Sequence, residues 1–168
     1  AFLESKEKYK SMTFTFAENP EYVTTNSSYS YWQARHLIGA EPYLHLNCDI
    51  VLFPQLIQRL KESPFENAVL VDKNVKLDDS MEQVVVDGGR IIKMDKANLP
   101  NAHGRGSGMA KLSPAAVSFM LQKMEEHLAR GDKNQHCFGL LRHALTKVPV
   151  HALDAAGLLF WEINNPLD

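Results

Sequence analysis

The chain has 168 residues, 45% of them hydrophobic and 23% charged, which is enough for one globular domain with its own core. Its formal net charge of −2 excludes a basic surface for nucleic acid, and no apolar stretch reaches membrane-spanning length. Two cysteines, Cys48 and Cys137, suggest no disulfide framework and favour a reducing cytoplasm. A signal-peptide pattern and an initial Met are both missing, so we expect the chain to begin inside a longer protein.

The first half of the chain alternates strand patterns with helix patterns. β-Branched and aromatic residues predict a strand over 13–17, and cap residues precede a helix predicted over 29–38. An apolar run over 43–51 predicts a buried strand that brings Asp49 to its C-terminal end. Pro54 opens the next helix, because proline is tolerated in a first helical turn.

The second half contains one hairpin, two further helices and several short strands. The Asp87-Gly88 pair is the turn signal of the hairpin, and glycines over 104–108 predict a flexible lead into a strand. In chain order, the elements predicted by apolar pattern and capping are a strand 68–71, hairpin strands 83–86 and 91–94, a strand 109–112, helices 115–129 and 138–145, and closing strands 148–153 and 158–163.

This order of elements predicts a single α/β domain over 1–168. Helices alternate with strands, and hairpin-like segments come late, so we expect a mixed but mainly parallel sheet flanked by helices. In open α/β sheets, ligands bind outside the carboxyl ends of parallel strands, where Asp49 is expected. Asp49 is therefore either a magnesium ligand for a nucleotide or an ordinary acid in a strand-to-helix loop.

Other residues that could carry chemistry have weaker support. His45 alternates with the apolar residues of its strand, and the scattered histidines show no spacing typical of a zinc site. Cys48 lies beside Asp49 without a neighbouring His–acid pattern, which favours a buried, inert thiol.

Several motifs occur in an order that resembles a known family, the nucleoside triphosphate transferases, and especially their phosphocholine and sugar-phosphate cytidylyltransferase branch. Each motif is short, and the resemblance covers nearly the whole chain. The motifs are an Asn19-Pro20-x-Tyr22 loop, a helix start with Asn26, Ser27, Ser28 and Ser30, the strand ending in Asp49, the Asp87-Gly88 hairpin with trailing Lys96, Gly106-Ser107-Gly108 leading to Leu112-Ser113, and the ending 161–168.

The resemblance implies a Rossmann-like fold of the nucleotide-diphospho-sugar transferase type and a nucleotidyl transfer reaction. In that reaction a phosphate oxygen of a small acceptor attacks the α-phosphate of a nucleoside triphosphate, and pyrophosphate leaves. Such transfer needs positioning and charge neutralisation, which Mg²⁺ and carboxylates supply. The resemblance places Mg²⁺ at Asp49 and at Asn164, where the family has an aspartate. Asparagine offers Mg²⁺ a carbonyl oxygen but no charge.

The resemblance also implies residues that contact substrate. Lys96 follows the hairpin where the family often has a lysine near the substrate phosphate, and it is either that catalytic group or a solvated surface lysine. Asn26 either binds substrate or only caps its helix. Ser28 and Gly108 complete the expected substrate-binding set.

The chain departs from the family at its start. Family members begin with a strand and a glycine-rich loop whose backbone N–H groups cradle the triphosphate. No such loop precedes residue 13, so we expect an N-terminally truncated domain that turns over little substrate alone and forms a homo-oligomer. One alternative is a non-catalytic binding or oligomerising module on the same scaffold. A glycosyltransferase-like use of Asp49 would need a second acid nearby, where Val51 stands.

Overall fold

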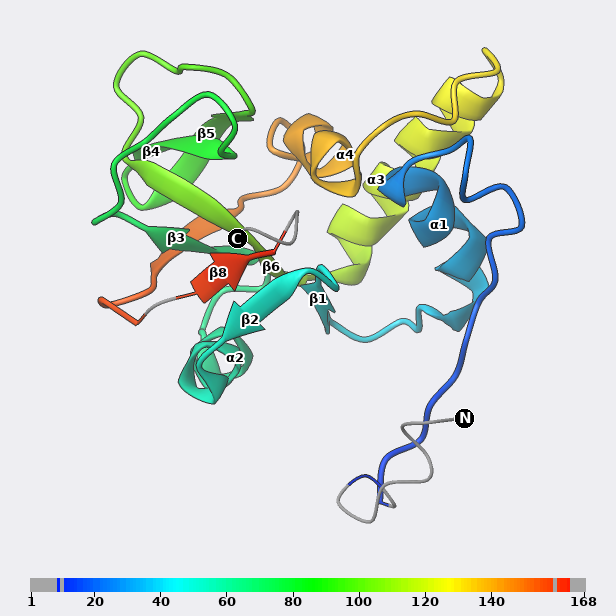
Figure 1. The fold of residues 1–168 in the computed structure, drawn as a ribbon, viewed down its shortest axis with the longest axis horizontal. Helices are drawn as coiled ribbons and strands as arrows, with labels where there is room; N and C mark the ends of the chain where they lie inside the picture. The colour runs from blue at the N-terminus through cyan, green and yellow to red at the C-terminus, as the bar shows by residue number, and fades with distance from the viewer. Residues whose placement is uncertain (1–8, 10, 159, 164–168) are drawn as a thin grey trace.

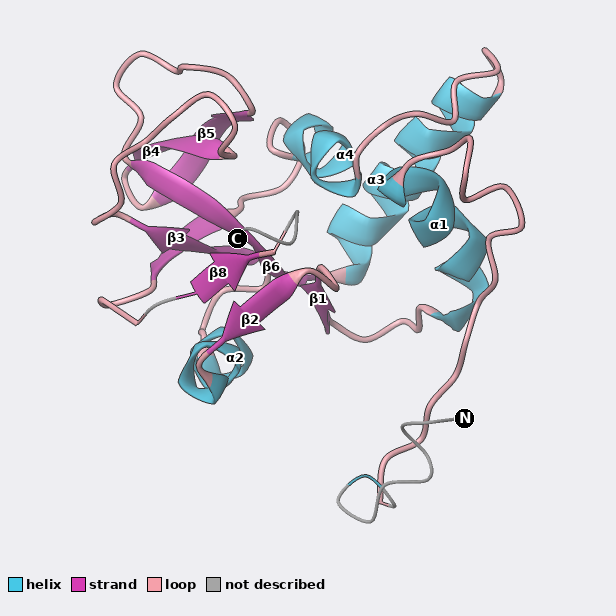
Figure 2. Ribbon diagram, viewed as in Figure 1, coloured by secondary structure: helices cyan, strands magenta, loops and turns pink. Residues whose placement is uncertain are grey.

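The computed structural model describes residues 9, 11–158 and 160–163 (Figures 1 and 2). Its helices and strands follow the predicted order closely. The helical elements are α1 (Ser27–Gln33), the 3₁₀ helix η2 (Ala34–Leu37), α2 (Pro54–Glu62), α3 (Pro114–Leu128) and α4 (Cys137–Ala144). The strands are β1 (Tyr43–Leu46), β2 (Ile50–Leu52), β3 (Ala68–Asp72), β4 (Gln83–Asp87), β5 (Arg90–Asp95), β6 (Gly104–Leu112), β7 (His151–Asp154) and β8 (Phe160–Glu162).

Six strands form one mixed sheet in the order β1-β6-β3-β7-β5-β4, which confirms a mixed α/β fold. The expectation that most pairings are parallel is wrong. Among the described strands only β3 and β7 pair in parallel, whereas β6 runs antiparallel to β1, β3 and β4. A short apolar run looks the same in a buried parallel or antiparallel strand, so the sequence could not show the direction.

The long strand β6 organises the sheet. Its C-terminal half pairs with β1, its N-terminal end pairs with β4, and β3 pairs along most of its length. The pairing with β4 joins the two ends of the order β6-β3-β7-β5-β4, so this part of the sheet curls back on itself. β2 and β8 form a separate two-stranded ribbon.

Helices cover both faces of the sheet. Alternate residues of β3 point to opposite sides: Val69 and Val71 pack with α1, α3 and α4, whereas Ala68 and Leu70 pack with α2 and the β2–β8 ribbon. Figure 1 shows α1, α3 and α4 grouped on one side and α2 on the other. None of the described helices is long and apolar enough to cross a membrane.

Residues 13–17 do not form the predicted strand. They have no strand partner among the described residues, and Figure 1 shows this segment running away from the rest of the molecule. Phe14 and Phe16 stack on each other with ring centroids 6.5 Å apart, and Phe16 is 65% exposed. β-Propensity alone does not make a strand, because a strand needs a partner and a surface on which to pack.

The glycine-rich segment 104–108 is part of β6 and not a flexible lead. Two of its glycines are needed because neighbouring groups fill the space of a side chain. A Cβ on Gly104 would lie 2.5 Å from the Asp72 carbonyl oxygen, and one on Gly108 would lie 2.5 Å from Asn47 Nδ2. The glycines therefore permit close packing of the strand. The prediction of a flexible lead treated glycine only as a residue that interrupts regular structure.

The single strand predicted over 43–51 is wrong, because this stretch divides into β1 and β2, which belong to different sheets. The remaining elements agree with the predictions to within a few residues. Gly88 and Gly89 both have positive φ, as the tight turn between β4 and β5 requires. Ser113 caps α3 by accepting a hydrogen bond from the Ala116 N–H. α1 differs most, because it begins at Ser27, directly after its cap Asn26, and becomes 3₁₀ after Gln33.

Candidate functional site

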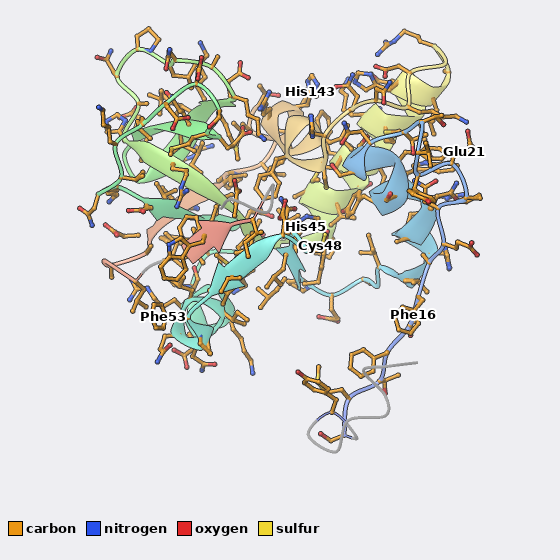
Figure 3. All side chains as sticks on the ribbon, in the orientation of Figure 1. Phe16, Glu21, His45, Cys48, Phe53 and His143 are labelled. Atoms are coloured by element: carbon orange, nitrogen blue, oxygen red, sulfur yellow. The ribbon has the colours of Figure 1, made fainter. Side chains whose placement is uncertain are left out.

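A cavity of about 510 Å³ lies where the β1–β2 turn, the hairpin, the middle of β6 and the helices α1 and α4 meet. Figure 3 shows His45 and Cys48, which both line it, close together near the centre of the molecule. Its lining residues are Asn26, Ser27, Ser30, Tyr31, His45, Leu46, Asn47, Cys48, Asp49, Glu82, Lys96, Gly106, Ser107, Gly108, His136, Cys137, Phe138 and Glu162.

Asp49 lies in the turn between β1 and β2, not at the end of a single strand. Its Oδ1 atom is buried without a hydrogen-bond partner among the described residues. A buried carboxylate oxygen without a partner is costly in free energy, unless a ligand or cation satisfies it. Asp49 therefore has the environment that is expected of a carboxylate facing a ligand site.

The β2–β8 ribbon brings the C-terminal motif to Asp49. Ile50 lies opposite Glu162, and the Ile163 N–H donates to the Asp49 carbonyl at 2.8 Å. Glu162 lines the cavity and adds a second carboxylate near Asp49. Asn164, predicted as a second metal ligand, lies outside the described residues.

Lys96 follows directly after β5, is exposed and lines the cavity. Glu82 lines the same cavity and is 9% exposed. Arg142 of α4 holds Glu82 with two hydrogen bonds, of 2.9 and 2.7 Å, and holds Asp95 with a third contact of 2.7 Å. The Glu82–Arg142–Asp95 network thus fixes the end of β5, from which Lys96 extends.

The start of α1 forms another wall. Asn26 caps the helix through a 2.7 Å bond from the Ser27 N–H to its Oδ1, and it lines the cavity as well. Ser28 does not line the cavity: its side chain is 0% exposed, and its backbone N–H donates to the Gln135 carbonyl. The predicted contact of Ser28 with substrate is therefore not supported. Ser27 and Ser30, at other angles around the helix, line the cavity instead.

The aromatic part of the lining comes from α1, β1 and α4. The His45 ring makes edge-on contacts with Tyr31, Tyr43 and Phe138. Burial lowers the pKa of His45, and burial likewise raises the pKa values of Tyr31 and Tyr43. All three groups are consequently neutral near pH 7, and the Tyr43 hydroxyl donates to the Tyr31 hydroxyl at 2.9 Å.

The two cysteines differ in environment. Cys137 is buried, and burial raises the pKa of its thiol to about 12. Cys48 is exposed in the β1–β2 turn, so the expectation that it is buried is wrong. It follows the end of β1, where the backbone leaves the sheet, and the sequence showed no such end.

The structure thus gathers Asp49, Lys96, Asn26 and Gly108 around one cavity. Sequence reasoning did not select Asn47, Glu82, Ser107 or Glu162, which line the same cavity. Ser107 is 1% exposed, and its Oγ has no partner among the described residues. The only available sequence signal was position along the chain. Asn47, Ser107 and Glu162 each lie within two positions of a predicted site residue, and Glu82 lies next to the predicted hairpin strand 83–86.

Comparisons with known proteins identify the fold. No family model and no curated protein matches the sequence. Among solved structures, the inositol-1-phosphate CTP transferase from T. maritima matches with a TM-score of 0.72 at 20% identity, covering 89% of this chain and 60% of that one. The CTP:phosphocholine cytidylyltransferase from Streptococcus pneumoniae matches with a TM-score of 0.65 at 11% identity, covering 89% and 63%.

A protein assigned as a glucose-1-phosphate thymidylyltransferase from Bacillus anthracis matches with a TM-score of 0.74 at 10% identity, covering 99% of this chain and 66% of that one. The resemblance to nucleotidyltransferases is therefore confirmed at the level of the fold. The chain spans 60–66% of the length of these three structures.

Proposed function

We propose that this chain is a nucleotidyltransferase domain that binds a nucleoside triphosphate with Mg²⁺ and a small phosphorylated acceptor. The observation that carries the proposal is a cavity that is lined both by Asp49, whose Oδ1 is buried without a described partner, and by Lys96. The three structural neighbours are named for the same reaction class, with CTP or thymidylyl donors and phosphorylated acceptors. We infer a cytidylyl donor from the two CTP-dependent neighbours.

The described carboxylates fit a magnesium ion. Mg²⁺ is usually held by one or two carboxylates together with substrate phosphate oxygens. Asp49 supplies an unpartnered carboxylate oxygen, and Glu162 lines the same cavity. No group of three His, Cys, Asp or Glu side chains suited to a metal occurs within the described ranges. Asp49 would therefore hold the ion jointly with the substrate, and the ion would neutralise charge on the phosphates.

The residues of the chain would mainly position the two substrates and stabilise the charge on their phosphates. Lys96 would bind an oxygen of the acceptor phosphate and hold it in line with the α-phosphate of the nucleotide. The acceptor oxygen forms the new bond to that phosphorus as the bond to pyrophosphate breaks. Little covalent chemistry is needed from the protein in such a transfer. The Glu82–Arg142–Asp95 network would keep Lys96 in place.

Isothermal titration with Mn²⁺ and CTP tests the proposal. We expect the wild type to bind the metal–nucleotide complex, Asp49→Ala to lose this binding, and Asp79→Ala, at an exposed site outside the cavity, to keep it. Asn164→Asp should tighten metal binding by adding a charge. Equal binding by the wild type and Asp49→Ala would remove Asp49 from the site.

Turnover separates an enzyme from a binding module. We expect pyrophosphate release from CTP and phosphocholine by this chain alone to be slow. No glycine-rich loop with backbone N–H donors for the triphosphate precedes residue 13 in this sequence, and the absence of one such donor costs about 10²–10³ in rate. If release is detectable, Asp49→Ala should abolish it. Binding without any release, at every acceptor tried, would favour the non-catalytic module.

A further inference from the structure

Asn47 is a second polar group on the turn that carries Asp49. It lies two residues before Asp49 and lines the same cavity. Its backbone N–H donates to the Gly108 carbonyl at 2.9 Å, which joins the turn to β6. Its side-chain amide contacts His45 through Oδ1, and its Nδ2 donates to no described residue, so Nδ2 remains available as a donor.

His45 holds the Asn47 amide from one side. His45 Nε2 lies 3.3 Å from Asn47 Oδ1. An amide oxygen only accepts hydrogen bonds, so this contact is a hydrogen bond when the imidazole is the Nε2–H tautomer. The ring is itself fixed by edge-on contacts with Tyr31, Tyr43 and Phe138. Because Oδ1 is bound by His45, the amide cannot rotate freely, and Nδ2 keeps one orientation.

Gly108 makes room for the amide on the other side. A Cβ at this position would lie 2.5 Å from Asn47 Nδ2 and 2.7 Å from Asn47 Cγ. The amide therefore packs directly on the backbone of β6, in the space of the missing side chain. Three separate contacts, from His45, the Gly108 carbonyl and the Gly108 Cα, thus place an uncharged donor next to Asp49.

We propose that Asn47 Nδ2 donates a hydrogen bond to a phosphate oxygen of the substrate bound at Asp49, and that His45 is the positioning residue for this contact. The inference rests on the proposed function, since it takes the ligand of the cavity to be phosphorylated. A phosphate is favoured because Asp49 and Lys96, from two different elements, both line the cavity around the amide. A neutral amide donates to the phosphate without repelling a cation at Asp49.

Titration calorimetry of Asn47→Ala tests the contact. We expect CTP with Mg²⁺ to bind about 10- to 100-fold more weakly than to the wild type, the usual loss for a hydrogen bond to a charged group. Asn74→Ala is the matched control, because Asn74 is exposed and outside the cavity, and it should bind as the wild type does. The phosphate could belong to the triphosphate or to the acceptor. A loss that appears with tripolyphosphate identifies the former, and one that appears only with glucose 1-phosphate identifies the latter.

Two His45 variants test positioning. His45→Gln keeps an N–H donor near the place of Nε2, and it should bind CTP within about threefold of the wild type. His45→Phe keeps the ring but not the donor, and it should bind about three- to tenfold more weakly. In ¹⁵N spectra the wild-type imidazole should be the Nε2–H tautomer, and the Asn47 side-chain NH₂ signals should shift when CTP is added.

Unchanged CTP binding in Asn47→Ala, with binding abolished in Asp49→Ala, would overturn this inference and leave the proposed function standing. A wild type that binds none of the phosphorylated ligands would overturn both. Equal binding by His45→Gln and His45→Phe, or unshifted Asn47 NH₂ signals, would remove the positioning role of His45.

Discussion

At the scale of single residues, the site depends on how close β6 comes to the β1–β2 turn. Gly108 and Gly106 lie on the same strand and differ in the space around them. A Cβ on Gly108 would meet Asn47 at 2.5 Å and Ile50 at 2.7 Å, whereas the nearest atom to one on Gly106 would be Val84 Cγ1 at 3.4 Å. Gly106 is therefore a suitable control position for a substitution at Gly108.

We predict that Gly108→Ala lowers the free energy of unfolding by about 1–3 kcal/mol, because overpacking moves Asn47 and Ile50. The displaced amide should also weaken CTP binding. Gly106→Ala should change the free energy of unfolding by less than about 1 kcal/mol. Urea unfolding and calorimetry of both variants make the test, and equal effects of the two would contradict it.

His45 gives the molecule a stability that depends on pH. Burial lowers the pKa of His45 in the folded state, while Asn47 opposes this shift weakly. Below its ordinary pKa of about 6.5 the unfolded chain therefore binds a proton that the folded chain does not. This contribution to stability is complete above about pH 6.5 and is lost as the pH falls through the interval below it, toward the folded pKa.

We therefore predict that the free energy of unfolding of the wild type, relative to that of His45→Phe, is constant above about pH 6.5 and falls on acidification. Each pKa unit of the shift corresponds to about 1.4 kcal/mol. Urea unfolding at a series of pH values measures the difference. A wild type that gains stability relative to His45→Phe as the pH falls would show that His45 is charged in the folded state.

At the scale of elements, α4 is joined to the hairpin by Arg142. Its partner Glu82 is 9% exposed and depends on Arg142 for two hydrogen bonds. Removal of the guanidinium would leave a nearly buried carboxylate without a cation, which is costly. The Lys73–Asp154 pair, by contrast, is about half exposed on both sides and should contribute little.

We predict that Arg142→Met lowers the free energy of unfolding by about 2–4 kcal/mol, and that Lys73→Met lowers it by less than about 1 kcal/mol. Arg142→Met should also weaken binding of a phosphorylated acceptor, because the end of β5 carries Lys96. Chemical unfolding gives the first result and calorimetry the second. Equal losses in the two variants would show that burial of Glu82 is unimportant.

Glycine in α4 offers a gain in stability. Gly139 lies inside the helix, and the nearest atom to an added Cβ is His136 Cβ at 4.0 Å. Gly139→Ala should therefore raise the free energy of unfolding by about 0.5–1 kcal/mol through helix propensity. Gly131, which has a φ of 75° after α3, is the control, because alanine there should be destabilising by about 1 kcal/mol. Thermal unfolding of both variants should show shifts of opposite sign.

At the scale of the whole molecule, apolar surface and an open strand edge remain exposed. Within the described part of the chain, β1 pairs only with β6, so its other edge is unpaired. Met12 and Phe16 are mostly exposed, and Figure 3 shows Phe16 on the segment that runs away from the body. Open edges and apolar patches are common sites of association between copies of a chain.

We accordingly propose that the chain forms a homodimer or higher oligomer through this segment and the β1 edge. Light scattering at micromolar to high micromolar concentration should give a mass above that of one chain. The double variant Phe14→Ser, Phe16→Ser should shift the mass toward the monomer without changing the free energy of unfolding. A monomeric wild type that is stable to heating would contradict the proposal.

The sequence by itself determined the number, type and order of most elements. Apolar periodicity, the Asp-Gly turn and the cap at Ser113 are local signals, so β3, the β4–β5 hairpin, α2 and α3 could be predicted. The order of motifs likewise indicated the nucleotidyltransferase fold, and the same resemblance selected Asp49 and Lys96, which both line the cavity.

The tertiary structure decided the pairing and the completed site. Strand direction, the unpaired segment 13–17 and the role of glycine in β6 depend on which strands meet, and a sequence window does not contain the partner. The same reason hid Glu82 and Asn47, which become site residues only because α4, β6 and the β1–β2 turn converge. The sequence likewise predicted Ser28 and not Ser27 as a substrate-binding residue. Which of the two serines faces the cavity depends on the rotation of α1 about its axis, and this rotation is set by packing on α3 and α4.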